Sequence, residues 1–96
     1  MSDLCAQRMI TEQRMTIRLN ELPTDRWATV SEVDVPADLK DREIVLRLVE
    51  LGFVPDERVC VVAMGIPGRE PMAVRVGGST FALRRHEASF VRVSPM

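Results

Sequence analysis

This chain offers few side chains that could take part in a reaction. It has one histidine, His86, and two cysteines, Cys5 and Cys60, in 96 residues. A catalytic dyad or a histidine-rich metal site cannot be built from one histidine alone. His86 stands between two charged residues and is interpreted as a surface residue, and Cys60 lies in an apolar run that is typical of a buried thiol. The sequence therefore predicts a protein that is not an enzyme.

A group of carboxylates precedes and opens a predicted helix, at Asp34, Asp38, Asp41 and Glu43. Helix capping and solvation explain these acids well. The alternative is a site for Fe²⁺ or another divalent transition metal, because ferrous iron is commonly held by carboxylate and histidine together. We expect no cofactor, and the weak candidates for such a metal site are Asp34, Asp38, Asp41 and His86.

Basic residues are in excess only in the second half of the chain, where residues 51–96 hold 6 basic and 4 acidic side chains. The net charge of the whole chain is −1, which argues against binding to nucleic acid. A modest basic patch on a strand face would suit an acidic protein partner. The alternative is a solvated face whose charges discourage edge pairing. The candidate partner-binding residues are Arg75, Arg84 and Arg92, with Ile66 and Pro67 in a predicted loop.

One helix is predicted over residues 39–51, from the spacing of its apolar residues. Asp38 is placed to cap its first turn. Gly52 is placed to end it in the left-handed conformation, which would let Phe53 pack on Leu48.

A β-hairpin is predicted around the turn Gly77-Gly78. A two-residue loop pairs Val76 with Ser79, and hence Val74 with Phe81 and Met72 with Leu83, so that all these side chains share one face. Arg75 then lies opposite Thr80 on the other face.

Further strands are predicted at 27–33, 58–64 and 90–93, with a short helical turn at 85–89. The fold class is mainly β, a small five-stranded barrel with one α-helix inserted after the first strand. Residues 1–17 are expected to form a tail and residues 18–96 the domain.

No apolar run is long enough to span a membrane and there is no secretory signal, so we expect a cytoplasmic protein. The predicted core is Val30, Val45, Leu48, Leu51, Phe53, Val59, Val61, Val74, Val76, Phe81, Leu83, Val91 and Val93.

The stretch from Leu19 to Val93 resembles the FeoA family of ferrous iron transport accessory proteins. The resemblance rests on an ordered set of segments: Leu22-Pro23, 47–55 at the end of the helix (RLVELGFVP), 71–78 (PMAVRVGG) and 81–85 (FALRR). It implies an SH3-like barrel and a partner, the FeoB-type membrane permease, whose cytosolic part carries a GTP-binding domain. Asp25 and Asp56 stand where the family commonly has glycine, and aspartate tolerates the left-handed backbone better than most residues.

The candidate residues and the family resemblance together suggest two functions of different kinds. The first is an adaptor that binds the cytosolic region of the permease and modulates its assembly or its GTP-linked transport. The second is a metal-responsive module that binds a transition metal ion. Self-association through an exposed strand edge is a further alternative.

Overall fold

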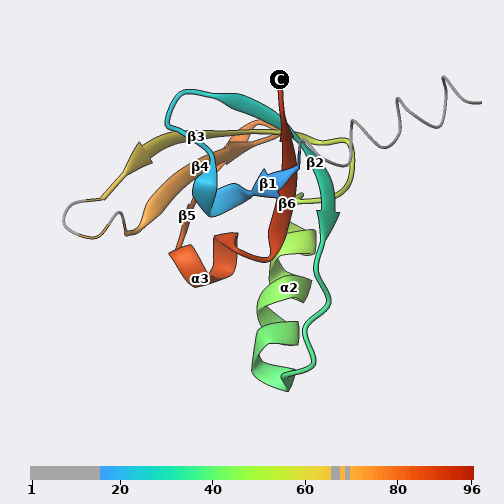
Figure 1. Cartoon of the computed structure of the whole chain (residues 1–96). Helices are drawn as coiled ribbons and strands as arrows, with labels where there is room; N and C mark the ends of the chain where they lie inside the picture. The colour runs from blue at the N-terminus through green and yellow to red at the C-terminus, as the bar shows by residue number, and fades with distance from the viewer. Residues whose placement is uncertain (1–15, 66–67, 69) are drawn as a thin grey trace, which may run out of the picture.

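The structure is a computed structural model that describes residues 16–65, 68 and 70–96 of the chain. Its elements follow in the order β1 (Ile17–Arg18), the 3₁₀ turn η1 (Leu19–Glu21), β2 (Trp27–Val33), α2 (Leu39–Leu51), β3 (Arg58–Met64), β4 (Met72–Val76), β5 (Ser79–Leu83), α3 (Arg85–Ala88) and β6 (Val91–Pro95). The strands form one antiparallel sheet in the order β1-β6-β2-β3-β4-β5. The sheet curls around the core as a small barrel (Figure 1). The fold is the predicted mainly β barrel with one helix after a strand, with one short strand more than expected.

The hairpin of β4 and β5 has the predicted register. Met72 pairs with Leu83, Val74 with Phe81 and Val76 with Ser79. Gly77 adopts a positive φ of 59°, which the tight turn requires. The register therefore confirms that Arg75 and Thr80 lie side by side on the face opposite the core.

Helix α2 begins and ends where the sequence predicts. The Asp38 carboxylate accepts a hydrogen bond of 2.8 Å from the Lys40 backbone N–H. Gly52 has a φ of 114°, and the Phe53 backbone N–H donates to the Leu48 carbonyl at 3.0 Å. Leu48 and Phe53 are both buried, so the end of α2 is fixed to the barrel.

The core is made by the inward faces of the strands together with η1, α2 and α3. Leu51 and Phe81 are only partly buried, which corrects the predicted core at these two positions. Leu19 and Leu22, at the start of the domain, are fully buried but were not among the predicted core residues. In β2 the inward face carries Ala28 and Val30, which are both buried.

Among the described residues, no helix is long and apolar enough to cross a lipid bilayer. The predicted tail at 1–17 lies outside the described residues except for Thr16 and Ile17, and Ile17 pairs with Val93 in the sheet.

Candidate interaction site

A row of four residues crosses the outer face of the sheet from β2 to β5. Trp27 pairs with Cys60, Cys60 with Arg75, and Arg75 with Thr80. Because side chains alternate along each strand, these residues lie opposite the core-facing Ala28, Val59 and Val76. The row sets an aromatic ring and a guanidinium on either side of a thiol.

The outer face combines exposed apolar groups with arginine. Trp27 is 44 % exposed, and its side chain lines a shallow pocket of about 270 Å³ with Arg58 and Met96. Arg58 precedes Cys60 by two residues on β3, so it shares this face. Arg84 follows the buried Leu83 at the end of β5 and is exposed. We call Trp27, Arg58, Arg75 and Arg84 the outer arginine face.

The three guanidinium groups of the outer arginine face have no carboxylate within ion-pair distance among the described residues. No outward position of β3, β4, β5 or the part of β2 that pairs with β3 carries an acid. These arginines are therefore available to an acidic surface that approaches the sheet.

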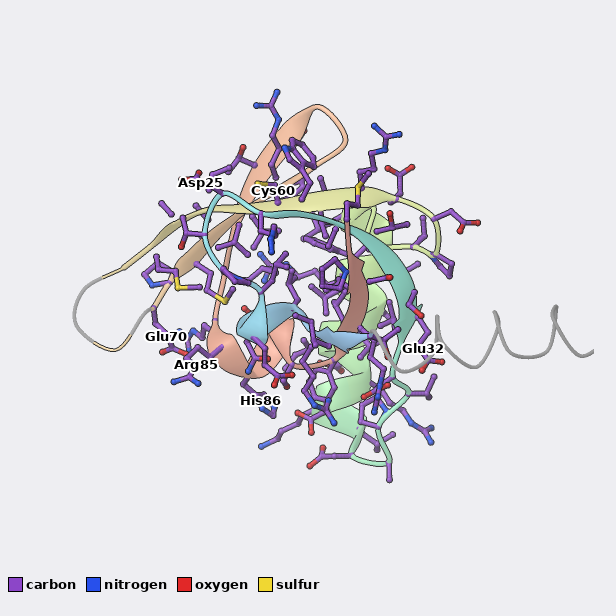
Figure 2. The ribbon with its side chains drawn as sticks, turned by 45° about the horizontal axis from the view of Figure 1, so that its top comes forward. Asp25, Glu32, Cys60, Glu70, Arg85 and His86 are labelled. Atoms are coloured by element: carbon purple, nitrogen blue, oxygen red, sulfur yellow. The ribbon has the colours of Figure 1, made fainter. Side chains whose placement is uncertain are left out.

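Cys60 lies beneath this face and is not activated for chemistry. Burial raises the pKa of its thiol, the nearby Asp25 carboxylate raises it further, and Arg75 opposes both. Figure 2 shows Cys60 and Asp25 close together at this end of the barrel. A raised pKa keeps the thiol protonated, and the thiolate is the nucleophilic form. Cys60 is thus a packing residue, as its apolar neighbours predict.

Arg92 does not lie with Arg75 and Arg84. Its Nε contacts the Asp34 carboxylate at 3.1 Å and the Glu32 carboxylate at 3.7 Å. Figure 2 shows Glu32 on the opposite side of the barrel from Cys60, which is the strand neighbour of Arg75. The predicted basic patch therefore divides into a face with Arg75 and Arg84 and a separate ion-pair network around Arg92.

The candidate metal ligands are dispersed as well. Asp34 is held by Arg18 and Arg92, and Asp38 caps α2. Only Asp41 and His86 meet, with 3.0 Å between Oδ1 and Nε2. His86 is exposed, as predicted, and its ring also stands edge-on to Phe90 with the centroids 5.0 Å apart.

Ile66 and Pro67 lie outside the described residues. Trp27 and Arg58 are members of the outer arginine face that sequence reasoning did not identify. The signal that could have found them is the strand register, because a pairing of β2 with β3 aligns Trp27 with Cys60 and so with Arg75.

The family model of the FeoA domain matches residues 17–95. This chain belongs to the FeoA domain family. FeoA from Stenotrophomonas maltophilia, a prokaryotic SH3-domain protein solved in complex with zinc, is 46 % identical, with a TM-score of 0.71 over 81 % of this chain and 89 % of that one. FeoA from Chlorobium tepidum is 29 % identical, with a TM-score of 0.66 over 83 % of this chain and 70 % of that one.

The FeoA fold also occurs in larger proteins. A manganese-dependent transcriptional repressor in complex with manganese has a TM-score of 0.71 over 84 % of this chain and 37 % of its own. At 20 % identity this likeness shows the fold alone. The search of curated proteins gave no match.

The zinc of the S. maltophilia FeoA raises the question of whether this FeoA domain has ligands for such an ion. Within residues 16–65, 68 and 70–96, no three His, Cys, Asp or Glu side chains come together as a metal site would need. A tetrahedral zinc site takes four ligands, or three with an open position, and Asp41 with His86 supplies two. The described residues do not fit such a site.

Proposed function

We propose that this chain is a cytoplasmic accessory protein of ferrous iron uptake that binds the cytosolic region of a FeoB-type permease and modulates its assembly or its GTP-linked transport. Membership of the FeoA family supports the connection to ferrous iron transport. The observation that carries the proposal is the outer arginine face, where Arg58, Arg75 and Arg84 have no acidic partner among the described residues.

The chemistry of this face suits binding to a protein surface. Tryptophan and arginine are the residue types that contribute most to protein interfaces. The partner surface that complements them carries carboxylates together with a small apolar area, because Arg58 lines a pocket with the exposed Trp27 ring. Association would be steered by charge and weakened by salt.

The experiment is an NMR titration of the isotope-labelled full chain with the cytosolic domain of the permease, with and without guanine nucleotide. We expect shifts of the amide signals of β3, β4 and β5 and of the Trp27 indole N–H. The double charge reversal Arg75→Glu/Arg84→Glu should weaken binding by at least about tenfold, which corresponds to about 1.4 kcal/mol. It should also reduce the dependence of the affinity on salt.

The matched control is Lys40→Glu/Arg47→Glu, which changes the net charge by the same amount on the exposed side of α2. If the two double variants weakened binding equally, the net charge of the chain and not the outer arginine face would determine the affinity. Unchanged affinity in Arg75→Glu/Arg84→Glu would remove the face from the proposed function. Thermal unfolding of each variant shows whether it remains folded.

A further inference from the structure

β5 forms one edge of the sheet, and no described strand pairs with its outer side. Its five residues, Ser79–Leu83, include no charged residue and no proline, and they pair with β4 without a bulge. Natural sheets normally protect an edge with charged side chains, proline, a bulge or a very short strand. The strand at the other edge, β1, has only two residues. The edge of β5 is therefore open to pairing with another extended chain.

The hairpin register shows which backbone groups of β5 lie along the open edge. Val76 and Ser79 close the two-residue turn, so they exchange hydrogen bonds with each other. Because such pairs alternate along antiparallel strands, Thr80 and Ala82 point their N–H and C=O groups away from β4. Both residues are exposed, and no described backbone group bonds to them on that side. Two donors and two acceptors thus lie along the edge with the spacing of a β-ladder.

The side chains beside this edge favour an acidic occupant. Thr80 is the neighbour of Arg75 on the outer face, and Arg84 follows β5 on the same face. Neither arginine has a carboxylate within ion-pair distance among the described residues. The Glu70 carboxylate, at this end of the hairpin, accepts a hydrogen bond of 2.8 Å from the Arg85 backbone N–H instead (Figure 2). A second copy of this chain would add further unpaired arginines, so charge complementarity selects an acidic chain.

Strand geometry specifies the residue pattern of that chain. Residues of an added strand opposite Thr80 and Ala82 point to the outer face, and the residue opposite Phe81 points to the other side. Carboxylates at the outward positions lie within reach of Arg84. Across the small Thr80 side chain they also reach Arg75, whose strand lies about 10 Å from the added one. Phe81 is only partly buried, so an apolar residue beside it would complete its burial.

We propose that the open edge of β5 binds an extended segment of a partner protein, in which acidic and apolar residues alternate, as an additional antiparallel strand. Backbone hydrogen bonds supply an attraction that any strand would share, and the outer arginine face selects the acidic one. In the antiparallel direction Thr80 and Ala82 each exchange both hydrogen bonds with one residue of the added strand. This inference rests on the proposed function for the identity of the partner, and on the β5 edge for its chemistry.

The test follows amide hydrogen exchange of the isotope-labelled full chain by NMR, with the synthetic peptide Ac-EVEVE-NH2 as the probe. In the free chain, Thr80 and Ala82 should exchange faster than Phe81, whose N–H bonds to β4. At about 5 mM peptide we expect the exchange of Thr80 and Ala82 to slow by at least about fivefold, with little change at Phe81. The control peptide Ac-KVKVK-NH2 should leave all three rates unchanged, because its lysines repel the arginines.

Two modified peptides separate strand pairing from simple attraction between charges. In the antiparallel ladder the glutamate N–H groups of the probe point toward β5, and the valine N–H groups point to solvent. Methylation of the last two glutamate nitrogens should therefore abolish the protection, whereas methylation of the two valine nitrogens should preserve it. The two peptides have the same charge and composition. Equal protection by both would show a purely electrostatic contact and would overturn the proposal.

A pair of variants tests the edge from the side of the chain. Ala82→Pro removes an outward N–H without taking a hydrogen bond from β4, and it should weaken binding of Ac-EVEVE-NH2 by at least about fivefold. Ala82→Val keeps that N–H and is the matched control, which should bind like the wild type. Thermal unfolding shows whether each variant keeps its fold. If Ala82→Pro does not, the methylated peptides decide the question on the wild-type chain.

Three further results would overturn the proposal. One is unchanged exchange at Thr80 and Ala82 in about 5 mM peptide. Another is slow exchange in the free chain that becomes faster on dilution, which would make a second copy the occupant. The third is exchange that is slow at every concentration of the free chain and becomes fast when residues 1–15 are removed, which would make that segment the occupant.

The cytosolic domain of the permease separates this inference from the proposed function. If the domain binds the outer arginine face but leaves the exchange of Thr80 and Ala82 unchanged, the proposed function stands and this inference fails. If the domain does not bind while the peptide protects both amides, the β5 edge is a binding site and the proposed function fails.

Discussion

Two aspartates hold backbone conformations that favour glycine. Asp25 has a φ of 66° and Asp56 a φ of 76°, each in the turn before a strand. The Asp56 backbone N–H donates to the Val30 carbonyl at 2.9 Å, which fixes this turn against β2. Aspartate tolerates the left-handed backbone better than most residues, and both turns adopt this conformation, as the sequence predicts.

Substitution of Asp56 should separate backbone strain from side-chain effects. We expect Asp56→Ala to lower the free energy of unfolding by about 1 kcal/mol, because alanine tolerates the left-handed region less well than aspartate does. Asp56→Gly should stay within about 0.5 kcal/mol of the wild type, since relief of strain offsets the greater freedom of the unfolded chain. Urea denaturation measures both values. If Asp56→Gly were as damaging as Asp56→Ala, the carboxylate and not the backbone would be the stabilising feature.

At the scale of elements, α2 could be predicted because its signals are local. Asp38 at its start, Gly52 at its end and the apolar spacing between them each act within a few residues. The hairpin of β4 and β5 is local for the same reason. In contrast, β1 has only two residues, and neither periodicity nor a turn marks it. Its position depends on β6, which lies at the other end of the sequence.

The packing of α2 on the barrel depends on Leu48, which is 2 % exposed. We expect Leu48→Ala to cost about 2–5 kcal/mol of unfolding free energy, because it removes buried methyl groups and leaves a cavity. Arg47→Ala, one residue away on the exposed side, should change the stability by less than about 0.5 kcal/mol. Thermal and urea unfolding compare the two. Similar costs at both positions would mean that α2 is held by its helix propensity and not by this contact.

At the scale of the whole molecule, Asp34 joins both ends of the domain. Its carboxylate contacts Arg18 on β1 at 3.3 Å and Arg92 on β6 at 3.1 Å, and the Asp34 backbone N–H donates to the Phe90 carbonyl at 2.8 Å. This network explains why Arg92 could not be assigned from the sequence. The charge of each residue can be read from the sequence. Arg18, Asp34 and Arg92 are far apart along the chain, however, and only the order of the strands in the sheet brings them together.

Removal of the Asp34 charge should weaken this contact between the two ends of the domain. We expect Asp34→Asn to lower the free energy of unfolding by about 1 kcal/mol, since the pairs are partly exposed and partly screened. The loss should shrink in about 1 M NaCl, where the Debye length falls to about 3 Å. Glu57→Gln, an exposed acid outside the network, is the control and should be neutral. A loss that is independent of salt would indicate that Asp34 acts through hydrogen bonding and not through charge.

The position of β6 has a consequence for the synthesis of the chain. β6 contains the last residues of the barrel, yet it lies between β1 and β2, which contain the first. While the ribosome is still adding the residues of β6, β1 has no strand beside it and one edge of β2 stays open. The barrel therefore closes only after the residues of β6 have been added, and loss of this strand would expose two strand edges at once.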